Sequence, residues 1–457
     1  MLRKHIYFVG IGGIGMSALA RYFKAKGFCV AGYDRVSSVL TRELEQEGIS
    51  IHYVDDVAMI PEAYRKPDDT VVVYTPAVPS DMSEMTWFRE HNFVIQKRSQ
   101  ILGEITRMQK GLCVSGTHGK TTTSTMLSHL LHNSSVQCNA FLGGISKNFS
   151  KNLLLSDESD LVVIEADEYD HSFLTLSPYM AVVTAVDADH LDIYGTVEAY
   201  RAGFEEFTSL IRPDGVLLMK EGLPIHPRLQ KGVTHYSYSV DKGDFHAENI
   251  RIGKGEIVFD FVTPKEVIKD IQLGVPVYVN IENGVAAMSI AWLNGVRPDE
   301  LREGMKSFRG VKRRFDFHIK SDKIVFLDDY AHHPNELKSS IESIRRLYAD
   351  RRLTVVFQPH LYTRTRDLAD DFAKVLSTAD ELMLLDIYPA REQPIPGVNS
   401  QMLLDKVELK NKRLISKQDL VKSVDERAYD VLLMVGAGDL DLLIPEMEQK
   451  FRKKYNI

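Results

Sequence analysis

The segment that most constrains this chain is Gly116-Thr117-His118-Gly119-Lys120-Thr121-Thr122. An apolar run predicted as a strand, 112–115, precedes it, and a predicted helix, 121–132, follows it. Backbone N–H groups at a helix N-terminus attract anions, the lysine reaches β- and γ-phosphates, and the following threonine can bind Mg²⁺. Val114 stands where the strict pattern has glycine, so the loop is a shortened variant. A glycine turn followed by a chance Lys-Thr is the alternative, but the flanking strand and helix favour binding of ATP with Mg²⁺.

Acidic and histidine side chains follow two further predicted strands of the same region. Glu165 directly follows the run 160–164, and His190 lies a few residues beyond the run 180–185. Ligands of open α/β sheets bind beyond the carboxyl ends of the strands. An acidic cluster alone is more often a solvated loop, but beside a phosphate loop we expect Glu165 and His190 to hold Mg²⁺ together with Thr121.

The N-terminus carries a second glycine-rich turn between a predicted strand and a predicted helix. Its glycines are Gly10, Gly12, Gly13 and Gly15, and Asp34 ends the next predicted strand 19 residues later. This matches the fingerprint in which glycines approach a pyrophosphate and an acid binds the ribose. The motif predicts a nucleotide diphosphate and does not distinguish a UDP-sugar from NAD.

Two polar clusters follow neighbouring predicted strands in the last third of the chain. They are Asp328-Asp-Tyr-Ala-His-His-Pro334 and Gln358-Pro-His-Leu-Tyr-Thr-Arg-Thr-Arg-Asp367. His332 is a candidate contact for an amino acid, and Arg364 could clamp its carboxylate, because guanidinium and carboxylate groups match bidentately. A helix cap with a stacked surface histidine is the alternative, but two clusters at one sheet edge favour a site.

The fold prediction is α/β throughout, because apolar runs of strand length alternate with helix-length segments. The predicted strands are 5–9, 28–33, 70–74, 112–115, 160–164, 180–185, 324–327, 353–357, 381–385 and 431–435, and one predicted helix is 16–26. From residue 215 to 281 we expect antiparallel strands, among them 256–262 and 275–280. We predict a Rossmann-like domain at 1–109, a central P-loop domain with a mainly parallel sheet and a small antiparallel part at 110–311, and a second Rossmann-like domain at 312–457.

Composition excludes several protein classes. The 457 residues are 44% hydrophobic and 26% charged, and no run of eighteen apolar residues occurs, which argues against membrane insertion. A net charge of −7 argues against a dedicated nucleic-acid binder. Three cysteines without a CxxC pair indicate free thiols. With no signal-peptide pattern at the N-terminus, we expect a cytoplasmic multidomain protein.

Together these motifs resemble those of one family, the Mur ligases of peptidoglycan synthesis. The resemblance covers essentially the whole chain, with GIGGIGMS, SGTHGKTTT, EADEYDHSF, DADHLD, GVKRRFD, DDYAHHP and QPHLYTRTRD in the family's order. It implies that ATP phosphorylates the lactyl carboxylate of UDP-N-acetylmuramate and that L-alanine attacks the acyl phosphate. The three domains would then bind the UDP-sugar, ATP, and ATP with the amino acid. The resemblance leaves a monomer or a homodimer open.

The resemblance also implies roles for individual residues. Lys120, His190, His332 and Arg364 would act in catalysis, with Thr121, Glu165 and His190 at the metal. The UDP-sugar would contact the four glycines, Ser17 and Asp34. ATP would contact the phosphate loop, Asn280, Asn283 and Arg314, and the amino acid would contact Tyr330, His332, His360 and Arg364.

The chain departs from the family pattern at three positions. Leu361 stands where many relatives have the arginine of HRYTRT, and Val279 replaces a histidine of the adenine segment. Several Mur ligases have a carbamoylated lysine after the DHxD histidine, and the aligned position here is Phe204. We expect another group, such as water, to complete the metal site.

Alternative functions remain open at this point. A nicotinamide-dependent oxidoreductase would explain the N-terminal glycines but not the phosphate loop. A non-catalytic nucleotide switch would leave the arginine and histidine clusters without a role. Within the family, the alternatives are the ligase that recycles a whole tripeptide and a ligase that adds serine or glycine first. The recycling relative has a different segment where this chain has TRTRD.

Overall fold

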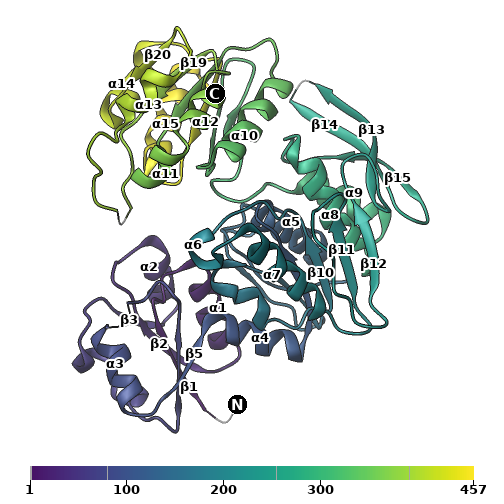
Figure 1. Cartoon of the computed structure of the whole chain (residues 1–457), viewed down its shortest axis with the longest axis vertical. Coiled ribbons are helices and arrows are strands. Elements are labelled where there is room, and N and C mark those ends of the chain that lie inside the picture. The colour runs from purple at the N-terminus through teal and green to yellow at the C-terminus, as the bar shows by residue number, and fades with distance from the viewer. Residues whose placement is uncertain (1–2, 80, 254, 391) are drawn as a thin grey trace. The chain divides into compact units, whose positions relative to one another are not determined.

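The computed structural model of the chain describes residues 3–79, 81–253, 255–390 and 392–457 (Figure 1). It divides into two compact units, one built from 1–248, 260–271 and 282–309 and the other from 249–259, 272–281 and 310–457. None of the helices in these described ranges is both long and apolar enough to cross a membrane. The three cysteines are free, as the sequence predicts.

The first sheet has five parallel strands in the order β3-β2-β1-β4-β5, the order of a Rossmann-like fold. The predicted strands 5–9 and 70–74 are confirmed. The predicted strand 28–33 is also present, but it begins one residue later, at Cys29. The strands are β1 (His5–Val9), β2 (Cys29–Tyr33), β3 (Ser50–His52), β4 (Thr70–Tyr74) and β5 (Val94–Lys97). The helices are α1 (Ile14–Ala25), α2 (Val39–Gln46), α3 (Ser83–Glu90), α4 (Arg98–Met108) and two short 3₁₀ helices, η1 (Val57–Met59) and η2 (Glu62–Tyr64).

The second sheet has seven strands in the order β12-β11-β10-β6-β9-β7-β8, and only the edge strand β8 is antiparallel to its neighbour. The strands are β6 (Lys110–Ser115), β7 (Asn139–Phe141), β8 (Leu153–Leu154), β9 (Leu161–Glu165), β10 (Met180–Val183), β11 (Val216–Lys220) and β12 (Thr234–Tyr238). The helices are α5 (Lys120–His132), η3 (Tyr169–Thr175), α6 (Leu191–Tyr194), α7 (Val197–Ser209), α8 (Val279–Leu293) and α9 (Pro298–Ser307).

The prediction for residues 215–281 is partly wrong. Strands β11 and β12 extend the main sheet in parallel, and a separate sheet is formed by β13 (His246–Gly253), β14 (Glu256–Val262) and β15 (Val267–Gln272). The connections in this small sheet are short, which only antiparallel neighbours allow. The predicted strand 275–280 does not exist, because Pro276 has no N–H for a strand ladder and α8 begins at Val279.

The third sheet has six strands in the order β16-β17-β21-β18-β19-β20, with β16 antiparallel to β17 and the rest parallel. The four predicted strands are confirmed, and the two edge strands were not predicted. The strands are β16 (Asp316–Lys320), β17 (Val325–Asp329), β18 (Leu353–Phe357), β19 (Glu381–Leu384), β20 (Lys412–Leu414) and β21 (Val431–Val435). The helices are α10 (Pro334–Leu347), α11 (Tyr362–Asp367), α12 (Ala369–Leu376), α13 (Ser400–Lys406), α14 (Lys417–Glu426), η4 (Leu440–Leu443) and α15 (Ile444–Tyr455).

A polar cluster lies in the interior of the first sheet's domain. The Tyr7 hydroxyl donates to Glu84 Oε2 at 2.7 Å and lies 2.6 Å from His52 Nε2. The Glu84 side chain is fully buried, and its other oxygen lies 3.3 Å from His52 Nε2. Burial, ahead of any neighbouring charge, raises the pKa of the Glu84 carboxyl to about 7.

This carboxyl should make the stability of the protein depend on pH. The folded chain holds the Glu84 proton up to about pH 7, whereas an unfolded chain releases it near its ordinary pKa of about 4.3. The protonated Glu84 carboxyl therefore makes its full contribution to stability below its ordinary pKa. As the pH rises towards 7 this contribution is lost, and the free energy of unfolding falls by roughly 2–3 kcal/mol. In the variant Glu84→Gln, the midpoint of urea unfolding should depend less on pH between pH 5 and 8 than it does in the wild type. The exposed Glu90 of the same helix provides the control Glu90→Gln, which should leave the wild-type slope unchanged.

Candidate functional site

The phosphate loop lies between β6 and α5, as the sequence predicts, and two of its glycines are required by their surroundings. Gly116 and Gly119 have φ of 131° and 82°, a region that side chains other than glycine rarely adopt. A Cβ at Gly116 would lie 2.1 Å from the hydroxyl oxygen of Thr184, and one at Gly119 would lie 2.8 Å from Oδ1 of Asn283. The loop is therefore shaped by close backbone approach, with the N-terminus of a 13-residue helix opening into it.

The Lys120 ammonium is held inside this loop. Its Nζ donates to the Gly116 carbonyl at 2.7 Å and lies 2.9 and 2.8 Å from the two carboxylate oxygens of Glu168. The Lys120 side chain is 14% exposed and that of Glu168 only 1%. Burial by itself lowers the pKa of Lys120, but the nearby carboxylates of Glu168, Asp167 and Glu165 outweigh it and raise the pKa, so the lysine is charged.

A hydroxyl chain connects the loop to Glu168. The Thr117 hydroxyl donates to the Asp187 carbonyl at 2.8 Å and lies 2.9 Å from the Tyr200 hydroxyl, which also reaches Glu168 Oε1 at 3.3 Å. The His118 ring lies 3.6 Å from the Asp187 carboxylate. These contacts tie the loop to the segment after β9 and to helix α7.

The three predicted metal ligands come from three elements around this loop. Thr121 lies in the first turn of α5, and Glu165 is the last residue of β9, close enough to Lys120 to influence its pKa. His190 has φ of 52° just before α6, lies 3.7 Å from Asp189 and packs its ring against that of Tyr169 at 5.1 Å. The Thr121 hydroxyl and the Glu165 carboxylate are oxygen donors of the kind that Mg²⁺ prefers, whereas the His190 imidazole is a nitrogen donor.

In sequence, Phe204 is the residue that aligns with the carbamoylated lysine of several Mur ligases. It is fully buried and packs edge-to-face against Phe173 and Tyr200, each at 5.2 Å. This position contributes to the core and offers no metal ligand. The expectation that another group completes the metal site stays a prediction.

The N-terminal glycine turn is closed by Asp34. The Gly12 N–H donates to one Asp34 carboxylate oxygen at 2.7 Å, and the Val36 N–H reaches the other at 3.2 Å. Gly10 has φ of 82°, and a Cβ at Gly12 would lie 2.8 Å from Asp34. In the dinucleotide fingerprint the acid binds ribose. Here it accepts hydrogen bonds from the loop itself.

The last glycine of this turn and Ser17 contact residues outside the turn. A Cβ at Gly15 would lie 2.2 Å from the Arg98 guanidinium, which lies 3.6 Å from the Asp167 carboxylate. The Gly13 residue caps α1 in extended conformation. Ser17 is fully buried: its hydroxyl donates to the Ile14 carbonyl and accepts from the side chain of Asn152. Ser17 therefore ties α1 to the second sheet's region in the described structure.

The two predicted adenine contacts have different surroundings. Asn283 lies against the phosphate loop, since its Oδ1 accepts from the Thr123 hydroxyl at 3.3 Å. Asn280, at 4% exposure, donates to the Val275 carbonyl at 3.2 Å. Arg314 belongs to the second unit, where its guanidinium lies 5.1 Å from the centre of the Tyr330 ring.

The four predicted amino-acid contacts do come together in the second unit. The His332 ring packs edge-to-face on Tyr330 at 5.3 Å and on His360 at 5.9 Å. An Arg364 nitrogen lies 3.5 Å from His360 Nδ1, and the Tyr388 ring stacks on the His360 ring at 5.8 Å. The polar clusters after β17 and β18 therefore form one group of side chains, as the sequence predicts.

Electrostatics make both histidines of this group neutral near pH 7. Burial lowers the pKa of His332, and the charge of Arg364 adds to it. Burial, followed by His332 and Arg364, lowers the pKa of His360 to about 4. Neutral rings do not repel an incoming ammonium group, but their lowered pKa also makes them weak bases. Arg364 remains the cation of the group, suited to a carboxylate.

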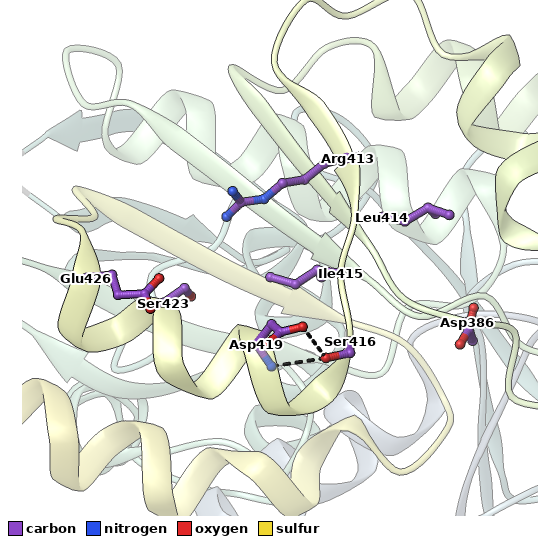
Figure 2. Close-up of a pocket in the computed structure, with 8 residues that line it drawn as sticks. All are labelled: Asp386, Arg413, Leu414, Ile415, Ser416, Asp419, Ser423 and Glu426. Atoms are coloured by element: carbon purple, nitrogen blue, oxygen red, sulfur yellow. Dashed lines mark hydrogen bonds between the residues drawn. The ribbon is translucent and has the colours of Figure 1, made fainter.

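A concave surface of the second unit lies apart from this group. A cavity of about 390 Å³ opens where β19 and β20 end and α14 begins (Figure 2). Its lining residues are Asp386, Arg413, Leu414, Ile415, Ser416, Asp419, Ser423 and Glu426. In the close-up, Ser416 and Asp419 bond to each other at the start of α14, so they cap the helix. This lining includes none of the predicted site residues.

Several residues of these sites were not predicted. The sequence shows Glu168 only as one member of an acidic segment. No sequence pattern indicates which carboxylate of that segment faces Lys120. Tyr388 follows β19 without any motif. Glu336 accepts from the backbone N–H of His332 at 3.0 Å, and the capping signal of Glu two residues after Pro334 could have revealed it.

Three models of one family match the chain. The Mur ligase family catalytic domain matches residues 5–110, the Mur ligase middle domain 114–291, and the Mur ligase glutamate ligase domain 313–446. The predicted site residues all fall within these matched ranges.

Individual relatives agree with the family models. The chain is 62% identical to a UDP-N-acetylmuramate–L-alanine ligase of Parabacteroides distasonis, over 97% of this chain and 96% of the relative. It is 58% identical to that of Phocaeicola vulgatus over 99% of both chains. A UDP-N-acetylmuramate-alanine ligase of Thermotoga maritima has a similar crystal structure, with a TM-score of 0.81 at 27% identity over 99% of both chains.

A second solved structure is similar in fold alone. The murein peptide ligase of Psychrobacter arcticus superposes with a TM-score of 0.67 at 21% identity, over 98% of both chains. The nearly complete coverage by three family models, and the relatives at far above 30% identity, leave one conclusion. The chain belongs to the Mur ligase family.

Proposed function

We propose that this chain is an ATP-dependent ligase that joins L-alanine to the lactyl carboxylate of UDP-N-acetylmuramate, a step of peptidoglycan precursor synthesis. The observation that carries the proposal is the 62% identity, over nearly the full length, to a relative with that named activity. The structure supports it with a phosphate loop holding a charged lysine and with a separate group containing Arg364 and two neutral histidines.

The first chemical step is transfer of the γ-phosphoryl group of ATP to the lactyl carboxylate, which forms an acyl phosphate and releases ADP. Such transfers depend mainly on positioning and on neutralising charge. The Lys120 ammonium and the N–H groups at the start of α5 supply fixed positive charge. Thr121, Glu165 and His190 would hold Mg²⁺, which when bound neutralises phosphate charge.

The second step forms the amide. The amine of L-alanine attacks the acyl carbon, the bond to the phosphate oxygen breaks, and phosphate leaves. The Arg364 guanidinium would bind the carboxylate of the amino acid. His332 and His360, neutral near pH 7, would not repel the ammonium group, which must lose a proton before it attacks. Tyr330 and Arg314 lie against each other beside them.

The remaining assignments follow from this proposal. The glycine turn with Asp34 would bind the UDP-sugar, and the ranges 1–109, 110–311 and 312–457 would be its three domains. Three free cysteines, two of them buried, suit the reducing conditions of a cytoplasm. Asp34 bonded to its own loop does not separate a UDP-sugar from NAD, so the phosphate loop remains the argument against the dehydrogenase alternative.

Phosphate release from ATP tests the function. With Mg²⁺ and UDP-N-acetylmuramate present, L-alanine should stimulate release far more than L-serine, glycine or L-Ala-γ-D-Glu-meso-diaminopimelate. Mass spectrometry of the product should show UDP-N-acetylmuramoyl-L-alanine. Release that requires the tripeptide instead would make the chain a recycling ligase, and no release with any of these acceptors would reject the ligase proposal.

A further inference from the structure

The Lys120 ammonium is already engaged by acceptors of its own chain in the described structure. A lysine side chain carries three N–H donors. Nζ donates to the Gly116 carbonyl at 2.7 Å and to Glu168 Oε1 at 2.9 Å, and it forms an ion pair with Glu168 Oε2 at 2.8 Å. A nucleotide phosphate that approaches Lys120 therefore meets a carboxylate that is already paired with the ammonium, and the two anions compete for it.

Glu168 is a fixed partner rather than a passing surface contact. Its side chain is only 1% exposed. The Tyr194 hydroxyl donates to its backbone carbonyl at 2.6 Å, and the Tyr200 hydroxyl lies 3.3 Å from its Oε1. Because the main chain is anchored and the carboxylate is enclosed, the lysine is held where the phosphate would bind.

We propose that Glu168 competes with the phosphates of the nucleotide for the Lys120 ammonium and thereby sets the nucleotide affinity of the loop. This rests on the proposed function, in which the loop binds ATP. The carboxylate takes the part of a phosphate and keeps Lys120 in place. When a nucleotide binds, it displaces one or both carboxylate oxygens and meets their negative charge. Glu168 is thus a positioning residue that acts through Lys120.

A purely structural role makes the opposite prediction. If Glu168 only supported the lysine, its removal would weaken binding of nucleotides that carry a β-phosphate. If it competes, removing its charge strengthens binding of ligands that carry a β-phosphate. AMP, which has no β-phosphate to meet Lys120, should bind equally well either way. Asp167 and Glu165 remain near Lys120 in such a variant, so the lysine keeps neighbouring negative charge.

The test is isothermal titration calorimetry of the full chain with Mg²⁺ and ADP, the ATP analogue AMP-PNP, or AMP. Glu168→Gln keeps the shape of the side chain, and it should bind ADP and AMP-PNP about tenfold more tightly, the effect of one charge-assisted hydrogen bond. AMP affinity should not change. Glu158→Gln, at an exposed position of the same unit, is the matched control and should behave as wild type.

Glu168→Asp keeps the charge but withdraws it by one methylene, so its ADP affinity should fall between the wild type and Glu168→Gln. If thermal unfolding shows that Glu168→Gln does not fold, the ADP affinity of Glu168→Asp tests the proposed competition instead. Unchanged or weaker ADP binding in the folded variants would overturn the proposed competition. A wild-type chain that binds none of the three nucleotides would instead reject the proposed function, so the two failures are distinguishable.

Discussion

Replacing Lys120 by alanine should lower phosphate release from ATP by roughly 10³-fold, the upper end of what one charge-stabilising donor contributes to a transition state. Lys120 is the charged donor inside the loop, and its ammonium lies 2.7 Å from the Gly116 carbonyl. Its loss also leaves the enclosed Glu168 carboxylate without its partner, which adds to the effect. A coupled phosphate assay with UDP-N-acetylmuramate and L-alanine measures the change.

Binding of the UDP-sugar provides the internal control for this variant. The glycine turn at residues 10–15 lies on another sheet, so calorimetry with UDP-N-acetylmuramate should give wild-type affinity. Lys231→Ala removes an exposed lysine of the same unit and should leave turnover unchanged. Turnover of Lys120→Ala within about threefold of wild type would contradict the assignment of the loop to ATP.

Replacing Arg364 by alanine should raise the KM for L-alanine roughly 100-fold, because a charged bidentate contact to the carboxylate is lost. Arg364 lies 3.5 Å from the His360 ring and is the cation of that group. The KM for ATP should change little. Arg364→Lys should recover only part of the loss, since an ammonium cannot present the planar fork of a guanidinium. Steady-state kinetics at saturating ATP and UDP-sugar measure both.

Arg366 is a matched control on the same helix. Its side chain is half exposed and pairs with the neighbouring Asp367 at 2.7 Å. Arg366→Ala should therefore leave the KM for L-alanine near the wild-type value. If Arg364→Ala lowers kcat without raising that KM, the guanidinium does not bind the amino acid, and the carboxylate clamp must be sought elsewhere.

Leu361 shows how far a departure from the family pattern can be interpreted. The sequence reveals only that an arginine of the family is missing there. In the structure Leu361 has φ of 71°, a strained conformation for a leucine, and begins α11. Its N–H donates to the Tyr388 carbonyl at 3.0 Å, which holds the loop that carries the His360 ring. A backbone hydrogen bond therefore fixes the conformation at Leu361. The identity of the side chain alone does not reveal this bond.

The sequence by itself determined the elements whose causes are local. The strands 5–9 and 353–357 are runs of apolar and β-branched residues buried on both faces of parallel sheets, and the structure has them at the same bounds. The phosphate loop was predictable because its glycines, lysine and threonine act within seven consecutive residues. The polar clusters at 328–334 and 358–367 were predictable because parallel strands end at the same edge.

Only the tertiary structure decided which side chains face one another. Four carboxylates lie within 165–170, and the fold turns Glu168 towards Lys120 because Tyr194 and Tyr200, from α6 and α7, anchor it. Asp34 bonds its own glycine turn, although the fingerprint assigns it to a ribose. The three-residue edge strand β20 exists through pairing with β19. Such choices depend on contacts between residues distant in sequence, and periodicity and spacing do not encode them.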